Sequence, residues 1–350
     1  MQIYYLFTQK NRNPIDQYLA LWGKIHAGRI LPVTYESLVR KKTFPPGLYI
    51  FSDIELLKGP ARERVIAIHQ TLSGDQVKYR TLNDPGVTLS RYPLLRALYD
   101  QGMNSFNVYK LGDDYSKARF PVFLRRTDDH RGPKTGLLRS PQDLRAALDQ
   151  LKTARENLDD WLVTEYCNVS DSRGIFRKYY SFFVGQTIIP RHLFFGSDWV
   201  QKHSKNIGKK EFHDEELGFL NNNDYQDQLQ LIFKTANIQF GRIDFGVVDG
   251  RVQTWEINTN PMIITHSHVK EESRMDIHRL FFQRFSSAFQ SMIDHPPTSP
   301  SGLEYWPDHC CARFHCLIER NRFSPLGKLI QKILWRLERQ GKKRIKSFIL

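Results

Sequence analysis

The chain has 350 residues, of which 40% are hydrophobic and 25% are charged. This composition excludes a disordered or fibrous chain and provides for two or three subdomains around a sizeable core. No apolar run approaches the roughly 20 residues of a membrane span, and Met1–Tyr5 begins as a strand, without the basic segment of a signal peptide. The four cysteines form no disulfide framework for a chain of this size, which agrees with a reducing compartment. We therefore expect a cytoplasmic protein.

The net charge of +14 favours polyanionic partners, but the excess is uneven. Residues 321–350 hold nine Lys or Arg and one Glu, a local net charge of +8. The rest of the chain is only mildly basic, so we do not expect nucleic acid as a partner.

Short apolar strands alternate with helical patterns in the first 85 residues. We expect strands at Ile3–Phe7, Arg29–Thr34 and Leu48–Phe51 and helices at Pro14–Ala27 and Gly59–Gln70. Strands that alternate with helices predict parallel βαβ units. A turn at Asn83–Pro85 ends this region.

The next region begins with a helix at Ser90–Gly102 and a buried strand at Phe120–Arg126. A loop with two glycines, Thr127–Gly136, follows the strand directly. A strand that ends in a cation and enters such a loop can place backbone N–H groups and positive charge along phosphates. A polar surface hairpin is the alternative interpretation.

Five further strands and helices precede the most informative part of the chain. They are a helix at Pro141–Glu156, strands at Trp161–Cys167, Arg177–Gly185 and Thr187–Phe195, and a helix at 223–239. The strand pair carries Lys178, Arg191 and His192 as candidate site charges. The basic loop Ser197–Asn206 is either a solvated turn or a lid over phosphates.

The segment Phe240–Pro261 is predicted to form a β-hairpin with a turn at Val248–Gly250. Glu256 and Asn258 are two residues apart, so they share one face of their strand, and the turn brings Asp244 opposite them. Two carboxylates and an amide oxygen then converge, and such oxygen ligands suit Mg²⁺. In the alternative interpretation, the Asp and the Glu merely face solvent.

This hairpin resembles the closing motif of the ATP-grasp superfamily, in which an Asp on one strand and a Glu-x-Asn on the next bind Mg²⁺. The resemblance covers residues from about 85 to 270. It implies an α/β (α+β) ATP-grasp fold with an N-terminal Rossmann-like pre-ATP-grasp domain. We therefore expect three parts: this domain at 1–85, the nucleotide- and metal-binding region at 86–293, and a linker with a basic amphipathic helical tail at 294–350.

The resemblance also implies residue roles. Asp244, Glu256 and Asn258 would bind the metal, and Asn260 and Pro261 would close the site. Arg242 and Lys202 would act on the transferred phosphoryl group. The nucleotide would be bound by Arg91, Arg125, Glu165, Tyr166, Cys167, Lys178 and Lys202. The family has Lys where this chain has Arg91 and Arg125, and Arg can bind phosphate bidentately but is not equivalent to Lys.

The implied activity is that of an ATP- and Mg²⁺-dependent carboxylate-amine ligase, which activates a carboxylate as an acyl phosphate for attack by an amine. The substrates would be small molecules or peptides. Two alternatives stay open: a phosphotransferase acting on a hydroxyl, and a non-catalytic nucleotide-binding scaffold.

Several features of the last ninety residues fit no assigned role. His266 and His268 share a face in extended chain, but we expect satisfied or solvent-exposed histidines. His309–Cys316 concentrates five soft ligands without the spacing of a zinc site. The basic tail at 321–350 has an apolar stripe, which predicts packing on the protein body, attachment to an anionic membrane surface, or docking of a partner.

Overall fold

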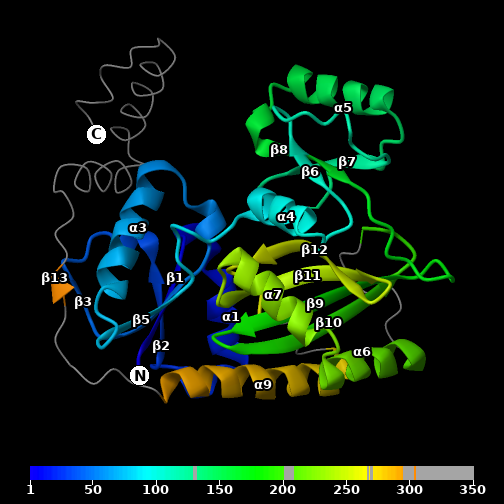
Figure 1. Ribbon diagram of the computed structural model, residues 1–350. Helices are drawn as coiled ribbons and strands as arrows, with labels where there is room; N and C mark the ends of the chain where they lie inside the picture. Colours follow the sequence, from blue (N-terminus) through cyan, green and yellow to red (C-terminus); the bar gives the residue numbers. More distant parts are fainter. Residues whose placement is uncertain (129–131, 201–208, 266–267, 269–270, 295–302, 305–350) are drawn as a thin grey trace, which may run out of the picture.

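The computed structural model describes residues 1–128, 132–200, 209–265, 268, 271–294 and 303–304 (Figure 1). Lys202, His266, the cluster at His309–Cys316 and the basic tail lie outside these residues, so the expectations about them stay predictions. Within the described residues, no helix is long and apolar enough to cross a membrane.

The N-terminal region forms a parallel four-stranded sheet, as the alternating pattern predicted. The strand order is β2 (Ile30–Thr34), β1 (Ile3–Phe7), β4 (Gly47–Phe51) and β5 (Tyr79–Leu82). Helix α3 (Gly59–Ser73) covers one face of it (Figure 1). The smaller elements are α2 (Tyr35–Leu38) and β3 (Thr43–Phe44), which pairs with β13 (Leu303–Glu304).

The first helix is shorter than the predicted Pro14–Ala27, because α1 spans Asn13–Leu21. The carbonyl oxygen of Tyr18 accepts the N–H groups of both Trp22 and Gly23, at 3.1 and 2.7 Å, which ends the helix. Gly23 then lies against the Tyr18 ring, where a β-carbon would come within 2.5 Å of a ring atom. A single 3₁₀ turn, Lys24–His26, follows.

A small antiparallel unit forms the upper part of Figure 1. Its strand order is β6 (Val108–Lys110), β8 (Trp161–Glu165) and β7 (Val122–Arg126), and α5 (Pro141–Thr153) packs on it. Helix α4 (Arg91–Asp100) leads into this unit and lies between it and the larger sheet. The short strand β6 was not predicted from the sequence.

The larger sheet is antiparallel, with the order β10 (Thr187–Gly196), β9 (Phe176–Val184), β11 (Phe240–Val248) and β12 (Arg251–Asn258). The predicted helix at 223–239 corresponds to α7 (Gln226–Ala236). Two further helices, α6 (Lys210–Asn222) and α9 (Met275–Ile293), pack beside β10 and were not predicted.

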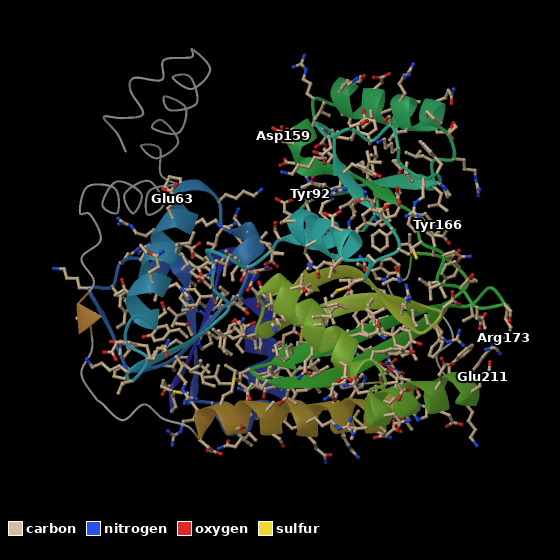
Figure 2. All side chains as sticks on the ribbon, in the orientation of Figure 1. Glu63, Tyr92, Asp159, Tyr166, Arg173 and Glu211 are labelled. Atoms are coloured by element: carbon tan, nitrogen blue, oxygen red, sulfur yellow. The ribbon has the colours of Figure 1, made fainter. Side chains whose placement is uncertain are left out.

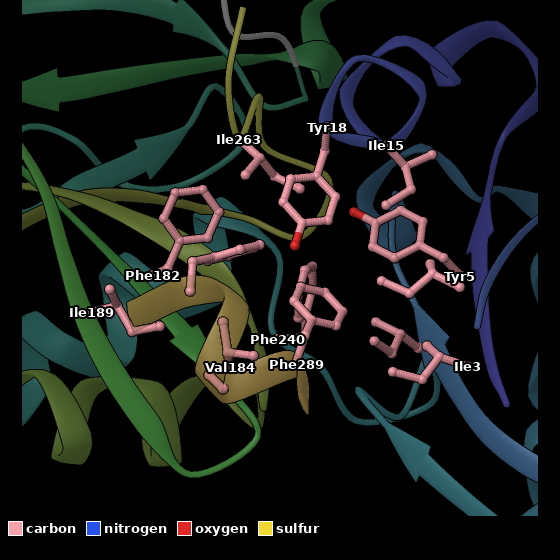
Figure 3. Packing of buried hydrophobic residues seen from close by; sticks show 14 of the residues in the cluster. Ile3, Tyr5, Ile15, Tyr18, Phe182, Val184, Ile189, Phe240, Ile263 and Phe289 are labelled. Carbon is pink, nitrogen blue, oxygen red and sulfur yellow. The ribbon is translucent and has the colours of Figure 1, made fainter. Parts of the chain in front are cut away.

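One apolar core joins the parallel sheet to the antiparallel sheet (Figure 3). Tyr5 of β1 meets Phe240 of β11 edge to face, with ring centroids 5.5 Å apart. Tyr18 of α1 stacks on Phe289 of α9. Phe182 and Val184, at one end of β9, belong to the same cluster. At the other end of β9, the same face carries Lys178 and Tyr180, and there the apolar core gives way to charged side chains.

Candidate functional site

The predicted hairpin is present, and it brings the predicted oxygen ligands together. Asp244 lies directly opposite Glu256, and Arg242 lies directly opposite Asn258. The turn is formed by Asp249 and Gly250, which both have positive φ, at 49° and 73°. Because the side chains alternate along each strand, these four residues share one face of the sheet.

An irregularity in the hairpin register extends the site in a way that the sequence did not reveal. The pairing shifts between Asp244 and Phe245, so no residue of β11 lies directly opposite Trp255. As a result, the neighbouring residues Trp255 and Glu256 both line the same pocket. Gly246 makes this arrangement possible, since a β-carbon there would come within 2.9 Å of both the Trp255 ring and Val169.

Two cations hold the buried Asp244 carboxylate. Lys178 Nζ lies 2.9 Å from Oδ2, and Arg242 Nε donates to Oδ1 at 3.0 Å. Burial, the largest single effect, would lower the pKa of Lys178, but the charges of Asp244 and Glu256 and the hydrogen bond to Asp244 act together with other neighbours to raise that pKa above its ordinary value. The pKa of Arg242 is raised by the same carboxylate against the same effect of burial. Both side chains are therefore charged.

Two further cations hold Glu256. Arg125 donates to Oε2 at 3.0 Å, and Arg91 donates to the same oxygen. Arg91 opens helix α4, and its guanidinium also donates to the carbonyl oxygens of Arg126 and Thr127, at 2.8 and 3.1 Å. It thereby ties the helix to the end of β7.

Six charged side chains thus meet on this face of the sheet. In these ion pairs between described residues, four side chains are positive and two are negative, a surplus of two positive side chains. Clustered cations attract anions, so the arrangement favours a negatively charged ligand.

A pocket of about 150 Å³ adjoins these charges. It brings together five of the predicted nucleotide-binding residues, Arg125, Glu165, Tyr166, Cys167 and Lys178, with the predicted metal ligand Glu256, whereas Arg91 does not line it. Its other walls are largely aromatic and were not predicted: Phe106, Phe123, Phe176, Trp199 and Trp255. Tyr166 lies where the small antiparallel unit faces the larger sheet (Figure 2). A flat apolar ring system fits such walls, and polar groups at one end fix its orientation.

At the end of β8, which was predicted to contact a base, the Glu165 carboxylate is hydrogen-bonded to other groups of the protein. Glu165 accepts N–H groups from Asn107 and Arg119, the Tyr109 hydroxyl and the Arg119 guanidinium. Burial, the largest single effect, would raise the pKa of Glu165, but the hydrogen bonds from Arg119, Asn107 and Tyr109 together hold that pKa below its ordinary value. The carboxylate therefore organises the pocket wall. A contact of Glu165 with a ligand stays a prediction.

The residues after the hairpin dock onto the parallel sheet. Asn260 N–H donates to the Asn258 side-chain oxygen at 2.8 Å. The Asn260 side chain accepts from the Tyr5 hydroxyl at 2.9 Å and donates to the Asn11 carbonyl at 2.9 Å. Thr259 donates to Glu55 at 2.6 Å. The metal-type ligands thus lie beside the carboxyl ends of β1 and β4, where ligands of parallel sheets bind.

Two of the candidate site charges, Arg191 and His192, lie instead in a separate buried cluster. There Arg191 contacts His192, His268 and His278, and Arg274 holds Glu216 and Glu271. This cluster, which we call the Arg191 cluster, lies between β10, α6 and the start of α9. His268 is satisfied within it, as expected from the sequence.

No protein-family model and no curated protein matches the chain. Among solved structures it is similar to D-alanine–D-alanine ligase from Helicobacter pylori, at 14% identity over 85% of this chain and 100% of the other, with a TM-score of 0.47. It is similar to macrocyclase MdnC from Microcystis aeruginosa, bound with precursor peptide MdnA, at 10% identity over 84% and 99% with a TM-score of 0.47. It is also similar to a RimK domain ATP-grasp protein from Sphaerobacter thermophilus, at 9% identity over 80% and 98% with a TM-score of 0.44.

Because these TM-scores lie below 0.5, no residue role, substrate or activity follows from the likenesses. The chain itself shows a parallel sheet, a small antiparallel unit, and an antiparallel sheet whose last hairpin carries Asp244 and Glu256-x-Asn258. The mixed α/β fold expected from the sequence is confirmed.

The aromatic pocket residues were the part of this site that sequence reasoning missed. Trp199 is the clearest case, because it lies just after β10 and packs against Phe123 and Tyr166, at centroid distances of 5.0 and 5.8 Å. The available signal was an aromatic side chain at the start of the basic loop. Its packing partners lie on other strands and could not be read from local pattern.

Proposed function

We propose that this protein is an ATP- and Mg²⁺-dependent ligase that activates a substrate carboxylate as an acyl phosphate for attack by an amine. The observation that carries the proposal is the hairpin face, where Asp244 and Glu256 are surrounded by four cations. In these ion pairs the cations outnumber the carboxylates, which suits MgATP, because MgATP carries a net negative charge near neutral pH.

The donor set fits magnesium. Asp244, Glu256 and Asn258 offer hard oxygen atoms on one face, of the kind that Mg²⁺ binds together with phosphates. A group of three His, Cys, Asp or Glu side chains placed for a metal is not found among the described residues, and here the third donor is an amide. Bound there, Mg²⁺ would neutralise charge on the transferred phosphoryl group.

The remaining groups would position the nucleotide. The aromatic pocket would hold the base, with Tyr166 and Cys167 at its edge. Arg91, Arg125 and Lys178 would bind phosphate oxygens, since each already holds a carboxylate of the hairpin. Arg242 would face the γ-phosphoryl group, and Lys202 would cover it from outside the described residues. Such positioning and charge neutralisation account for most catalysis in phosphoryl transfer.

The proposed reaction has two steps. A substrate carboxylate oxygen attacks the γ-phosphorus, and ADP leaves. The amine nitrogen then attacks the acyl carbon of the acyl phosphate and loses a proton, and inorganic phosphate leaves. Neither step requires a nucleophile from the protein, so the chain needs to bind, orient and shield the reactants.

Hydroxylamine trapping tests the proposal. Purified protein would be incubated with MgATP, pools of amino acids and short peptides, and hydroxylamine in place of the amine. We expect ADP release and a hydroxamate that both depend on one acid. ADP release with phosphorylation of a hydroxyl and no hydroxamate would instead indicate a phosphotransferase.

One observation supports a second candidate, a nucleotide-binding scaffold without turnover. Arg91 and Arg125 stand where the family has Lys, and both hold Glu256. Binding of MgATP without ADP release from any acid pool would favour this candidate. Attachment of the scaffold to a membrane surface or protein partner through residues 321–350 remains part of that proposal.

A further inference from the structure

Tyr180 lies at the centre of the charged face without being one of the predicted site residues. It is paired directly with Asp244 across β9 and β11 and with His192 across β9 and β10. Its side chain is buried, and Phe194 packs edge to face against it with ring centroids 5.0 Å apart. The ring is therefore fixed beside the carboxylate that we propose as a metal ligand.

The Tyr180 ring contacts both cations that hold Asp244. Lys178 Nζ lies 4.9 Å from the ring centroid, and so does the central guanidinium carbon of Arg242. Both distances are within the range of cation–π attraction. Each cation thus has two partners, the Asp244 carboxylate and the aromatic ring.

These double contacts matter because one carboxylate, Asp244, cannot bind Lys178, Arg242 and a magnesium ion equally strongly at the same time. A magnesium ion bound to Asp244 would withdraw much of the negative charge that holds Lys178 and Arg242 in place. A long cationic side chain without a partner becomes solvated and samples several rotamers, so it no longer has a fixed position. The ring does not bind the metal, so its attraction for the two cations persists.

We propose that Tyr180 is a positioning residue, whose ring keeps Lys178 and Arg242 aimed at the nucleotide phosphates when magnesium takes over Asp244. The inference rests on the proposed function. It assigns the ring face, rather than the hydroxyl, as the group that acts. Burial, the largest effect, raises the pKa of Tyr180 above its ordinary value, so the side chain contributes a neutral ring and no phenolate charge.

The chain offers a matched control on the same strand. Tyr179 is equally buried but points to the opposite face, where it packs against Phe219, Tyr225 and Phe245. Tyr180→Leu removes the ring under the two cations, Tyr180→Phe keeps it, and Tyr179→Leu removes a comparable ring away from them. Circular dichroism and thermal unfolding would establish that each variant is folded.

Calorimetric titration of the full chain with MgATP, and with ATP in EDTA, separates positioning from general stability. We expect Tyr180→Leu to weaken MgATP binding about tenfold and binding of metal-free ATP less than about threefold. Tyr180→Phe and Tyr179→Leu should keep both affinities within about threefold of wild type. Equal losses with and without magnesium, or equal losses in Tyr180→Leu and Tyr179→Leu, would overturn the inference. If the wild-type chain binds no MgATP, the proposed function fails instead.

Discussion

Two buried groups of charged side chains lie on the antiparallel sheet, and they differ in charge balance. The hairpin face has four cations and two carboxylates. The Arg191 cluster has two guanidinium groups, on Arg191 and Arg274, and two carboxylates, on Glu216 and Glu271. Among the described residues, the first group therefore has two more cations than carboxylates, whereas the second group has equal numbers of guanidinium and carboxylate groups.

The histidines of the Arg191 cluster are neutral as well. A guanidinium only donates hydrogen bonds, so the Nδ1 atoms of His192, His268 and His278 must accept from Arg191. Each imidazole then carries its proton on Nε2, and His278 uses it to donate to Glu271 at 3.1 Å. Among the described residues, the guanidinium and carboxylate groups of the Arg191 cluster are equal in number, as expected of a structural group. On the hairpin face the cations outnumber the carboxylates, as expected of the anion site that we propose.

The largest expected effect separates the two groups by stability. Arg274→Met would leave the Glu216 carboxylate, now held by Arg274 at 2.5 and 3.1 Å, buried without its hydrogen-bonded cation. Loss of one partner from a buried pair typically costs about 3–5 kcal/mol of unfolding free energy. Urea denaturation should show that loss, while the affinity for MgATP in the folded variant stays within about threefold. A loss below about 1 kcal/mol would mean that the cluster is not a closed structural group.

The second effect separates them by ligand affinity. Asp244→Asn removes one negative charge from the hairpin face and raises its positive surplus. We expect MgATP binding to weaken on the order of 100-fold, because an oxygen ligand loses its charge. Binding of metal-free ATP should stay equal or become tighter. Calorimetry measures both, and a parallel weakening of both would contradict the account of the surplus charge.

The smallest effect concerns acid. Burial, aided by the Arg191 charge, lowers the pKa of His268 to about 3, and burial also lowers the pKa values of His192 and His278. Below about pH 6.5 these histidines bind protons in the unfolded chain but stay neutral in the folded chain, so the unfolding free energy decreases as the pH is lowered. Each histidine adds up to about 1.4 kcal/mol per pH unit. The unfolding free energy would be measured by urea denaturation at several pH values between 7.5 and 4.5. We expect it to fall more steeply with falling pH for wild type than for His268→Gln. Equal slopes against pH would exclude this role for His268.

Local sequence pattern was sufficient for the hairpin. Residues two apart on a strand share a face, and a turn with Gly250 fixes which residues meet, so Asp244, Glu256 and Asn258 could be brought together from spacing alone. The parallel sheet followed in the same way from alternating strands and helices. These features depend on contacts that are near in sequence.

Features that depend on distant contacts could not be predicted. The ion pairs of Glu256 join it to Arg91 and Arg125, 165 and 131 residues away, and nothing local specifies them. The irregularity at Trp255 places two neighbouring residues in one pocket, against the alternation expected of a strand. His192 is paired with Tyr180, which is paired with Asp244, so the register places it beside the hairpin face. Its imidazole instead contacts Arg274, just before α9, and belongs to the Arg191 cluster.

The most direct test of the central claim is calorimetric titration of wild-type protein with MgATP, with metal-free ATP and with Mg²⁺ alone. Asp244 and Glu256 are each held by two cations, so Mg²⁺ alone should not bind measurably at millimolar concentration, whereas MgATP should bind with an affinity that falls as salt rises. Tight binding of Mg²⁺ without nucleotide, or no binding of MgATP, would contradict the account.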